Sequence, residues 1–340
     1  MFARTLLEWF RENGRELPWR QTRDPYAIWL SEIILQQTQV KQGWDYWERF
    51  MRHWPTVEAL AEATEDEVLR EWQGLGYYSR ARNLHYAAKQ IVALGHFPDT
   101  IEEIKQLKGV GDYTAAAIGS IAFGLPTAVV DGNVYRVLSR HFGIDTPINT
   151  TEGKKTFTTL AQSLLPPQEA SAYNQAIMDF GAIQCTPQSP RCNACPLMES
   201  CSAFREGRVG ELPVKQKTLQ VKERHLIYIY VRCQGETAIH RRGPGDIWQG
   251  LWEPLFIENG TLNIEDWLCD NFQFSIFNLQ LIAKGVKHVL THRILMADFY
   301  LLETEEKPAL PPDYIWIKET GLDQYAVPRL IEILLESLPL

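Results

Sequence analysis

Apolar residues in the first 185 positions follow the spacing of α-helices, and the alternation typical of strands is almost absent there. One helix is predicted to begin at Asp24-Pro25, because aspartate caps a helix N-terminus and proline fits its first position. The apolar run that follows carries this helix to about Val40. Further helices are predicted at residues 57–63, 65–73, 78–94, 100–107, 112–123, 132–141, 154–165 and 170–181. The N-terminal part is therefore expected to be an all-helical domain.

The pattern changes after residue 205. Residues 206–223 are polar and hold glycine and proline, which is typical of a linker. Beyond them, short runs predict strands at 225–233, 237–242, 251–257, 279–292, 295–303 and 314–318, with helices near 264–271 and 328–335. The chain is thus expected to be multi-domain, with an all-α domain at 1–205, this linker, and an α+β domain at 224–340.

Composition is compatible with two such domains, since the chain has 340 residues, of which 45% are hydrophobic. The net charge of −8 is uneven: residues 1–225 hold 25 Lys and Arg against 26 Asp and Glu, whereas the remainder holds 9 against 16. The acidity therefore does not exclude a nucleic-acid partner for the first part. No apolar run approaches the ~20 residues of a membrane span. The N-terminus lacks a signal peptide, so we expect a cytoplasmic protein with no membrane partner.

The pattern C-x6-C-x2-C-x5-C is formed by four cysteines, Cys185, Cys192, Cys195 and Cys201. Four thiolates within loop reach of one point suit an iron–sulfur cluster or a structural zinc. Zinc ribbons usually pair two C-x2-C hooks, and this loop has one, so we favour a 4Fe–4S cluster over zinc. A disulfide framework is not expected in a large chain without a signal peptide. Cys233 and Cys269 are expected to be core residues.

Residues 107–124 predict two helices joined by a Gly-x-Gly turn. Gly109 and Gly111 would let the backbone turn sharply and approach a ligand closely. The N–H groups of the turn and of the following helix would then bind a phosphate, as a helix-hairpin-helix does when it grips DNA without reading sequence. An ordinary turn between two helices is the alternative.

Two carboxylates are candidates for acid–base chemistry. Glu32 lies in the apolar run of a predicted helix, where Ile28 and Leu35 share its face, and desolvation there would raise its pKa. Asp131 precedes a predicted helix, whose dipole would keep it ionised beside a developing sugar cation. Cleavage of an N-glycosidic bond needs such an acid and such an anion. The alternatives are a buried ion pair for Glu32 and a simple helix cap for Asp131.

The hairpin, the segment VVDGN and the cysteine loop occur in this order, and over roughly residues 5–205 the chain resembles the endonuclease III superfamily of DNA glycosylases. Within that superfamily, four further motifs and the additional C-terminal domain resemble the MutY-type adenine DNA glycosylases. These motifs are LPWR at 17–20, SEIILQQTQV at 31–40, GLGYYSRARNL at 74–84 and NQAIMDFGA at 174–182. The resemblance implies an all-α helix-hairpin-helix glycosylase domain with an iron–sulfur cluster loop, followed by an α+β Nudix-like domain.

The activity that the resemblance implies is removal of adenine mispaired with 8-oxoguanine or guanine in double-stranded DNA. Glu32 would protonate adenine at N7 and later help to activate water. Asp131, with Asn133 beside it, would stabilise the sugar cation or trap it covalently. Tyr113 stands where bifunctional relatives carry the lysine that forms a Schiff base with the sugar. Tyrosine cannot form one, so strand cleavage by β-elimination should be weak or absent.

The resemblance also implies which residues contact DNA. Gln37, Thr38 and Leu75 match positions that line the oxidised guanine, and Tyr77 matches the wedge inserted into the base stack. The positions near the adenine pocket are matched by Arg15, Arg20 and Asp179. Judged by residue type alone, the tyrosines would more simply pack in a core and the arginines would be solvated at the surface.

The C-terminal domain lacks an R-E-x-x-E-E-x-G-type metal-binding helix, so Nudix hydrolysis is not expected. Family members often carry Phe-Ser-His in a loop that reads 8-oxoguanine. The matching residues are Leu290-Thr291-His292, in which Thr291 and His292 keep the hydroxyl and the imidazole but the aromatic residue is replaced. Tyr135 is a second departure, at a position often basic in relatives. The cysteine loop would present cations to phosphates through Arg191, Arg205 and Arg208.

Three rival functions follow from the same residues. The first is a bifunctional oxidised-pyrimidine glycosylase, and both Tyr113 and the C-terminal domain argue against it. A non-catalytic, cluster-bearing DNA-binding or damage-sensing protein disagrees with the retention of both Glu32 and Asp131. A nucleotide hydrolase disagrees with the missing metal motif. The sequence therefore predicts a monomeric glycosylase of the adenine type, associated with the nucleoid if bacterial, and it predicts no particular protein partner.

Overall fold

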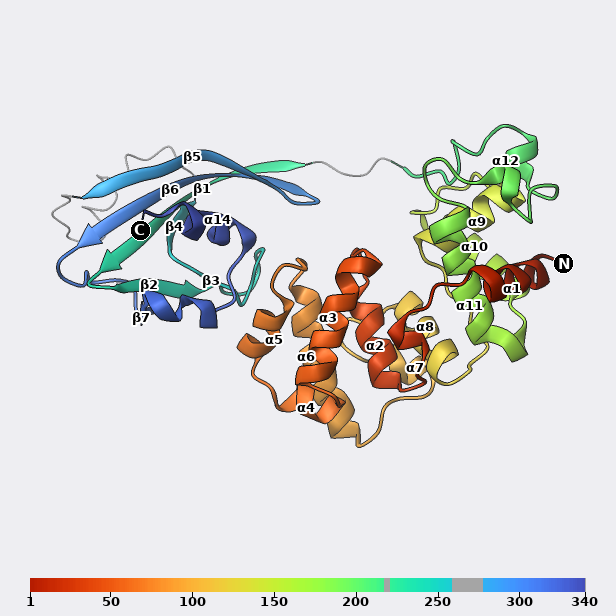
Figure 1. The fold of residues 1–340 in the computed structure, drawn as a ribbon, viewed down its shortest axis with the longest axis horizontal. Helices are drawn as coiled ribbons and strands as arrows, with labels where there is room; N and C mark the ends of the chain where they lie inside the picture. The colour runs from red at the N-terminus through yellow and green to blue at the C-terminus, as the bar shows by residue number, and fades with distance from the viewer. Residues whose placement is uncertain (217–220, 259–277, 340) are drawn as a thin grey trace. The chain divides into compact units, whose positions relative to one another are not determined.

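The computed structural model describes residues 1–216, 221–258 and 278–339 (Figure 1). They form two compact units. The helical unit consists of Met1–Glu62 and Asn83–Lys217, and the sheet unit consists of Ala63–Arg82 and Thr218–Leu340. The helix predicted at 264–271 and the predicted core residue Cys269 lie outside the described residues. Among the residues described, no helix has the length and apolar character needed to cross a membrane.

The helical unit is built from short helices joined by turns, as the sequence pattern predicted. Its α-helices are α1 (Phe2–Asn13), α2 (Pro25–Ile34), α3 (Val40–His53), α4 (Val57–Glu62), α7 (Ile101–Ile104), α8 (Asp112–Ala122), α9 (Gly132–Phe142), α10 (Thr151–Leu164), α11 (Ala170–Asp179) and α12 (Ser202–Arg205). Helix α6 (Ser79–Leu94) begins in the sheet unit and continues into the helical unit. Short turns of other helix types are η1 (Pro18–Arg20), η2 (Pro167–Glu169), the π-helical η3 (Phe180–Gln184) and η4 (Cys192–Ala194).

Helix α2 begins as predicted but ends early. The side chain of Asp24 caps it by accepting from the Tyr26 N–H, and Pro25 occupies its first position. The helix stops at Ile34 instead of Val40, because Gln37 adopts the left-handed conformation with φ of 58°. A separate helix, α3, then starts at Val40, and the sequence pattern did not predict it.

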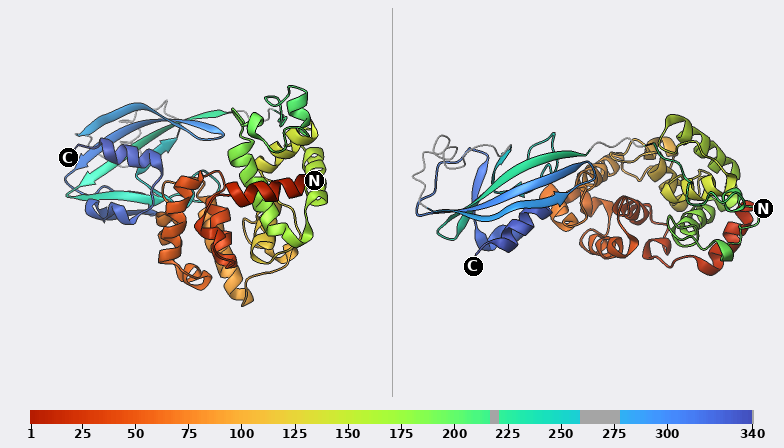
Figure 2. Two further views of the ribbon diagram at one scale, coloured as in Figure 1. Left: turned by 45° about the vertical axis from the view of Figure 1, so that its right-hand side comes forward. Right: turned by 90° about the horizontal axis from the view of Figure 1, so that it is seen from above.

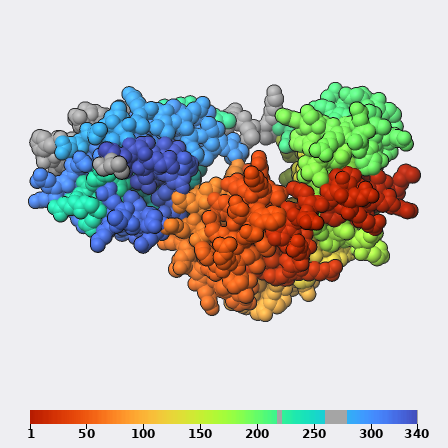
Figure 3. All heavy atoms as spheres, viewed as in Figure 1, coloured from red at the N-terminus to blue at the C-terminus, as the bar shows by residue number. Residues whose placement is uncertain are grey.

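The core of the helical unit joins segments far apart in the sequence. Helix α1 lies beside α11 (Figures 1 and 3), and buried side chains from both helices belong to one apolar cluster. The ring of Trp9 on α1 packs edge-on against Phe180, with 5.0 Å between ring centroids. The N-terminal helix is therefore part of the fold that holds α11 in place.

One sheet of seven strands forms most of the sheet unit. The strands are β1 (Lys222–Cys233), β2 (Glu236–Arg241), β3 (Trp252–Glu253), β4 (Leu255–Glu258), β5 (Leu279–Val289), β6 (Arg293–Thr304) and β7 (Tyr314–Lys318). Their order is β3-β2-β1-β6-β5, with β4 also paired to β1 and β7 to β2. The long strands β1, β6 and β5 run side by side (Figure 2), β1 and β6 in parallel. All six predicted strand runs are confirmed, with the run at 251–257 divided at Pro254.

Strand β1 is buried on both faces. Leu226 and Tyr228 pack against the C-terminal helix α14 (Arg329–Ser337), whereas Ile227 and Ile229 pack into a second cluster on the opposite face. Alternate residues of a strand point to opposite faces, so this strand carries the centre of the unit. The sequence predicted α14 within one or two residues of its observed ends.

The segment 63–82 packs against the strands through polar contacts. It holds helix α5 (Glu65–Trp72), whose Glu65 forms a 2.9 Å ion pair with Arg241 on β2. Arg82 Nη1 donates to the Gln249 carbonyl oxygen at 2.5 Å. The sequence assigned this segment to the helical domain, but these long-range contacts group it with the strands.

Candidate active site

A cavity of about 760 Å³ in the helical unit brings all four predicted catalytic residues together. Its walls come from the loop after α1, from α2 and the turn that follows it, from the start of α8, and from α9 and α11. The predicted residues that line it are Arg15, Arg20, Glu32, Gln37, Thr38, Tyr113, Asp131 and Asn133.

Glu32 is buried in this cavity, with 9% of its surface exposed. Tyr113 Oη donates to Glu32 Oε2 at 2.9 Å. Burial raises the pKa of Glu32 to about 7, although the hydrogen bond from Tyr113 partly opposes the rise. Because its hydrogen-bond partner is a hydroxyl, the alternative of a buried ion pair does not fit. The predicted desolvation of this glutamate is confirmed.

Asp131 is both a helix cap and part of the cavity wall. Its Oδ1 accepts from the Val134 N–H at 2.8 Å, and its Oδ2 accepts from Asn133 Nδ2 at 2.8 Å. The sequence predicted that the helix N-terminus would keep Asp131 ionised. Burial raises the pKa of Asp131, while these hydrogen bonds and the charge of Arg136 act in the opposite direction. The carboxylate is thus partly buried and accepts hydrogen bonds at both of its oxygens.

The Gly-x-Gly turn places Tyr113 at the start of α8. Gly109 has φ of 80°, and a Cβ there would lie 2.7 Å from the Asn83 side chain, so the turn needs glycine. Gly111 is the N-cap of α8 and offers no capping side chain to the first N–H groups. The two glycines form the predicted hairpin turn but do not line the cavity. The hairpin turn therefore fixes the start of α8, which carries Tyr113 and its hydrogen bond to Glu32.

Asp179 organises two of the arginines that line the cavity, Arg15 and Arg20. It is fully buried and accepts from Arg15 Nε at 2.9 Å and from Arg20 Nη1 at 2.7 Å. Burial opposes its ionisation, but the hydrogen bonds from Arg20 and Arg15 outweigh burial and lower the pKa of Asp179. Both arginines are mostly buried and fixed by this carboxylate, so they are not solvated surface residues.

The residues predicted to read the mispaired guanine are divided between the two units. Gln37 and Thr38 lie in the left-handed turn after α2, on the wall of the cavity. In the sheet unit, Tyr77 and Thr291 are joined by a hydrogen bond between their hydroxyl groups. A cavity of about 670 Å³ in that unit is lined by Leu75, Tyr77, Thr291 and His292.

Tyr77 differs from a core tyrosine. Its side chain is 44% exposed, and its backbone has the left-handed φ of 46° that non-glycine residues rarely adopt. Leu75, two residues before it, is buried. Thr291 lies in the turn between β5 and β6, where the Leu290 N–H donates to the Arg293 carbonyl oxygen at 2.8 Å. The sheet unit therefore presents an aromatic side chain held by a strained turn.

The four predicted metal ligands line one small cavity of about 30 Å³. They are Cys185, Cys192, Cys195 and Cys201. Burial raises the pKa of Cys195 to about 11, so this thiol stays protonated until a metal replaces the proton. In the described part of the chain, no three His, Cys, Asp or Glu side chains are already placed to hold a metal ion. The fit of an iron–sulfur cluster therefore rests on the donor set, four thiols around one cavity.

Of the three arginines predicted near the cysteines, Arg191 lines their cavity. Arg205 is exposed, and Arg208 pairs with Glu211 at 3.2 Å. Tyr135, the predicted departure at a basic position, packs its ring edge-on against Phe157.

Sequence reasoning missed the residues that connect the cysteine loop to Asp131. Arg136 Nη2 donates to Asn133 Oδ1 at 2.7 Å, and its Nε donates to the Cys185 carbonyl oxygen at 2.7 Å. Arg140, one turn later on α9, donates to the Thr186 carbonyl oxygen at 2.7 Å. Two arginines spaced by four residues among the apolar residues of one helix were the available signal. Gln175 and Met178 also line the cavity, and no local pattern distinguishes them.

Comparison with protein families gives two matches. Residues 30–166 match the family described as HhH-GPD superfamily base excision DNA repair protein. Residues 227–337 match the NUDIX domain family. These families cover the helical and the sheet-forming parts of the chain, which agrees with the predicted helical glycosylase domain and Nudix-like domain.

Two relatives of this chain are both named adenine DNA glycosylase. The adenine DNA glycosylase of Rattus norvegicus is 46% identical over 226 residues, which cover 62% of this chain and 44% of the rat protein. The adenine DNA glycosylase of Buchnera aphidicola subsp. Acyrthosiphon pisum is 33% identical over 99% of this chain and 97% of its own length. Among solved structures, a thermostable thymine-DNA glycosylase matches with a TM-score of 0.56 and 32% identity, covering 60% of this chain and 95% of its own. This chain thus spans less than half the length of the rat relative.

Proposed function

This chain belongs to the adenine DNA glycosylase family, and we propose that it excises adenine mispaired with 8-oxoguanine or guanine from double-stranded DNA. The observation that carries the proposal is the pair of carboxylates, the buried Glu32 and the partly exposed Asp131, on the walls of one cavity. They lie in unlike surroundings, since Glu32 accepts from a single hydroxyl whereas Asp131 accepts from an N–H and an amide. Such a difference separates the roles of proton donor and anion.

Glu32 is the proposed general acid. With a pKa of about 7, a large fraction of the carboxyl is protonated near neutral pH, so it can donate a proton to N7 of adenine. Protonation makes the base a neutral leaving group when its bond to the sugar breaks. The resulting Glu32 carboxylate can then accept a proton from the water that attacks the sugar. The hydrogen bond from Tyr113 orients the carboxyl for both steps.

Asp131 is the proposed partner of the sugar. Breaking the glycosidic bond leaves positive charge on the sugar, and a fixed carboxylate beside it stabilises that charge or forms a covalent bond with it. Asn133 and the N-terminus of α9 hold the carboxylate in place. Asn133 is itself held by Arg136, which also bonds the cysteine loop. Asp131 is thus positioned by a rigid network before DNA binds.

Tyr113 supports a monofunctional reaction. The Tyr113 hydroxyl bonds Glu32 and has no amine with which to form a Schiff base. Burial, with the nearby charge of Glu32, raises its pKa well above the usual value, so it remains a hydroxyl donor. We therefore propose base removal without β-elimination, which leaves an abasic site in an intact strand.

Recognition of the mispair is proposed to use both units. Tyr77 would enter the base stack while adenine is flipped out, and Thr291 and His292 would contact the oxidised guanine. Gln37 and Thr38 would contact it from the helical unit. The Gly109–Gly111 turn would bind a phosphate through its backbone N–H groups.

The cysteine loop would hold one 4Fe–4S cluster through Cys185, Cys192, Cys195 and Cys201. The cluster would supply a covalent cross-link that fixes this loop, with no redox step in base removal. Arg140 and Arg136 bond carbonyl oxygens of the loop, so fixing the loop also supports α9 and Asp131.

The function is tested by single-turnover excision on three duplexes, with A opposite 8-oxoguanine, A opposite G, and thymine glycol opposite A. Products are read with and without alkali. We expect loss of adenine from the first two duplexes and strand breakage that requires alkali. Nicking of the thymine-glycol duplex without alkali would instead identify a bifunctional pyrimidine enzyme. No excision from any duplex would favour a DNA-binding protein without catalysis.

A further inference from the structure

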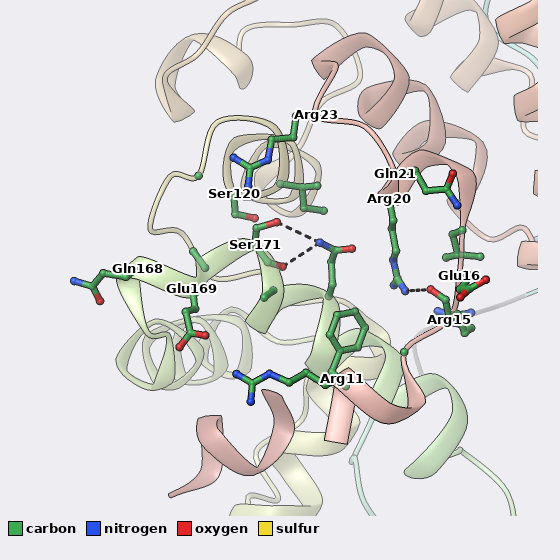
Figure 4. A pocket seen from close by; sticks show the side chains of 18 residues that line it. Arg11, Arg15, Glu16, Arg20, Gln21, Arg23, Ser120, Gln168, Glu169 and Ser171 are labelled. Carbon is green, nitrogen blue, oxygen red and sulfur yellow. Dashed lines mark hydrogen bonds between the residues drawn. The ribbon is translucent and has the colours of Figure 1, made fainter. Parts of the chain in front are cut away.

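A second cavity, of about 840 Å³, lies beside the candidate active site in the helical unit. The two cavities have five lining residues in common: Arg15, Leu17, Arg20, Ile121 and Gln175. A single layer of side chains therefore separates them. Figure 4 shows Arg15 and Arg20 on one side of the second cavity, with Ser120, Ser171 and Glu169 on the other.

The second cavity is lined by groups that both donate and accept hydrogen bonds. These are the amides of Gln21, Gln168 and Gln175 and the hydroxyl of Ser171. Guanidinium groups of Arg11 and Arg23 add planar cations, which stack on aromatic rings. A planar heterocycle with donors and acceptors along its edge, such as a free purine base, fits this lining. The volume is also in the range of small-molecule sites, about 300–1,000 Å³.

The shared wall contains fixed and movable side chains. Asp179 fixes Arg15 and Arg20 through short charge-assisted hydrogen bonds. Gln175 is bonded to its own helix, where its Nε2 contacts the Ser171 carbonyl oxygen at 3.3 Å and Ser171 Oγ at 3.2 Å. These bonds are long, so a change of rotamer at Gln175 breaks little. Gln175 is therefore the side chain of the wall best suited to move.

We propose that the second cavity receives the free purine base after cleavage and releases it to solvent, with Gln175 as the gate. This inference rests on the proposed function. The base enters the active site attached to the DNA strand, and after cleavage the abasic strand still occupies that entrance. A neutral base on the inner side then leaves through the opposite wall. The second cavity adjoins that wall and has the polar lining that a purine needs.

The test uses Ala172→Phe, with Ala172→Ser as its control. Ala172 lines the second cavity but not the active site, so a phenyl ring would fill only the proposed exit. Full-length protein is mixed in excess with a duplex that carries radiolabelled adenine opposite 8-oxoguanine. Cleavage is measured after a denaturing quench. Release is measured as label that passes a filter retaining the protein–DNA complex.

The wild type and Ala172→Ser should release label as fast as they cleave. Ala172→Phe should cleave within about twofold of the wild type but release label at least about tenfold more slowly, because overpacking blocks the route. Equal rates of cleavage and release in Ala172→Phe would overturn the proposal. Absence of cleavage by the wild type would instead overturn the proposed function.

A second measurement needs no variant. The wild type is bound to a duplex with a tetrahydrofuran abasic analogue opposite 8-oxoguanine, and free adenine is added. Saturation-transfer NMR should detect adenine in exchange with this complex, because the exit route remains open while DNA fills the entrance. Detection of adenine with the free protein but not with the DNA complex would contradict an exit at the second cavity.

Discussion

Two buried glutamates, one in each unit, have matching tyrosine partners and different electrostatic surroundings. In the helical unit, Tyr113 Oη donates to Glu32 at 2.9 Å. In the sheet unit, Tyr228 Oη donates to Glu253 at 3.0 Å. Glu253 also accepts from Arg242 Nη1, at 2.7 Å to each of its carboxylate oxygens. One carboxyl is thus paired with a cation, whereas the other is paired with a hydroxyl.

The difference gives the two carboxylates different expected roles, a structural one for Glu253 and the proposed acid chemistry for Glu32. Arg242 compensates the charge of Glu253, and His240 Nε2 lies 3.1 Å from the same carboxylate. Within the described residues, no cation forms an ion pair with Glu32, and burial outweighs the hydrogen bond from Tyr113 and the charge of Arg20, so its pKa rises to about 7. Burial alone therefore does not identify an acid catalyst. Burial without an ion-paired cation keeps a proton available near neutral pH, which supports the proposed role of Glu32 as the acid.

The largest expected effect is on catalysis. Glu32→Gln should lower the single-turnover excision rate about 10³-fold, because it removes the general acid but keeps the size of the side chain. Glu253→Gln, the matched change in the sheet unit, should leave the rate per folded molecule within about twofold of the wild type, because Glu253 does not line the candidate active site. The rates are measured on a duplex with adenine opposite 8-oxoguanine. Equal losses for both variants would remove the distinction between the glutamates.

The next effect is on stability, where the large loss is expected for the Glu253 variant and not for the Glu32 variant. Glu253→Gln should lower the free energy of unfolding of the sheet unit by about 3–5 kcal/mol, because it leaves the buried Arg242 without its main partner. Urea titration followed by hydrogen exchange of the β1 amides measures this unit separately. A loss below about 1 kcal/mol, the size of an exposed ion pair, would show that Arg242 is compensated elsewhere.

Glu32→Gln should stabilise the protein at high pH. A carboxyl with a raised pKa in the folded state contributes its full stability below the unfolded pKa of 4.5 and loses it as pH rises through about 7. The variant should match the wild type near pH 4.5 and exceed it by roughly 3 kcal/mol above pH 8. Urea unfolding of both proteins at the two pH values checks this. An equal difference at both pH values would mean that burial does not perturb Glu32.

The pH dependence of the reaction gives a smaller and independent effect. The value of kcat/KM should fall about tenfold per pH unit above about pH 7, because the acid is lost as Glu32 ionises. The residual activity of Glu32→Gln should lack this limb. A limb that persists in the variant would assign the titration to another group.

The smallest effect concerns the tyrosine. Tyr113→Phe removes a hydrogen bond that lowers the pKa of Glu32, so the alkaline limb should move to higher pH by about one unit or less. The maximal rate should also fall, because the variant loses the hydrogen bond that orients the Glu32 carboxyl. A limb that moves to lower pH would mean that Tyr113 raises the pKa of Glu32.

The sequence predicted those features that depend on local pattern. The apolar surroundings of Glu32, the helix cap at Asp131 and the Gly109 turn all follow from neighbours within a few residues, and the structure contains each of them. The six strand runs were also visible, because β-branched and aromatic residues cluster in short segments. Local sequence patterns therefore predicted most helices and strands and the surroundings of the two carboxylates.

Features that depend on distant contacts were not predictable in this way. Helix α2 ends because Gln37 adopts a left-handed conformation, and the sequence around it has neither glycine nor proline to signal a break. Segment 63–82 groups with the strands because Glu65 meets Arg241, which is 176 residues away. The contact between Arg136 and the cysteine loop depends likewise on how α9 packs.

The central claim is that Glu32 is a buried acid with a raised pKa, and the most direct test is its titration. The side-chain carboxyl carbon of Glu32 is followed by ¹³C NMR from pH 4 to pH 9 in the wild type and identified by its absence in Glu32→Gln. The account predicts a titration midpoint near pH 7. A midpoint near 4.5, the value for an exposed glutamate, would contradict it.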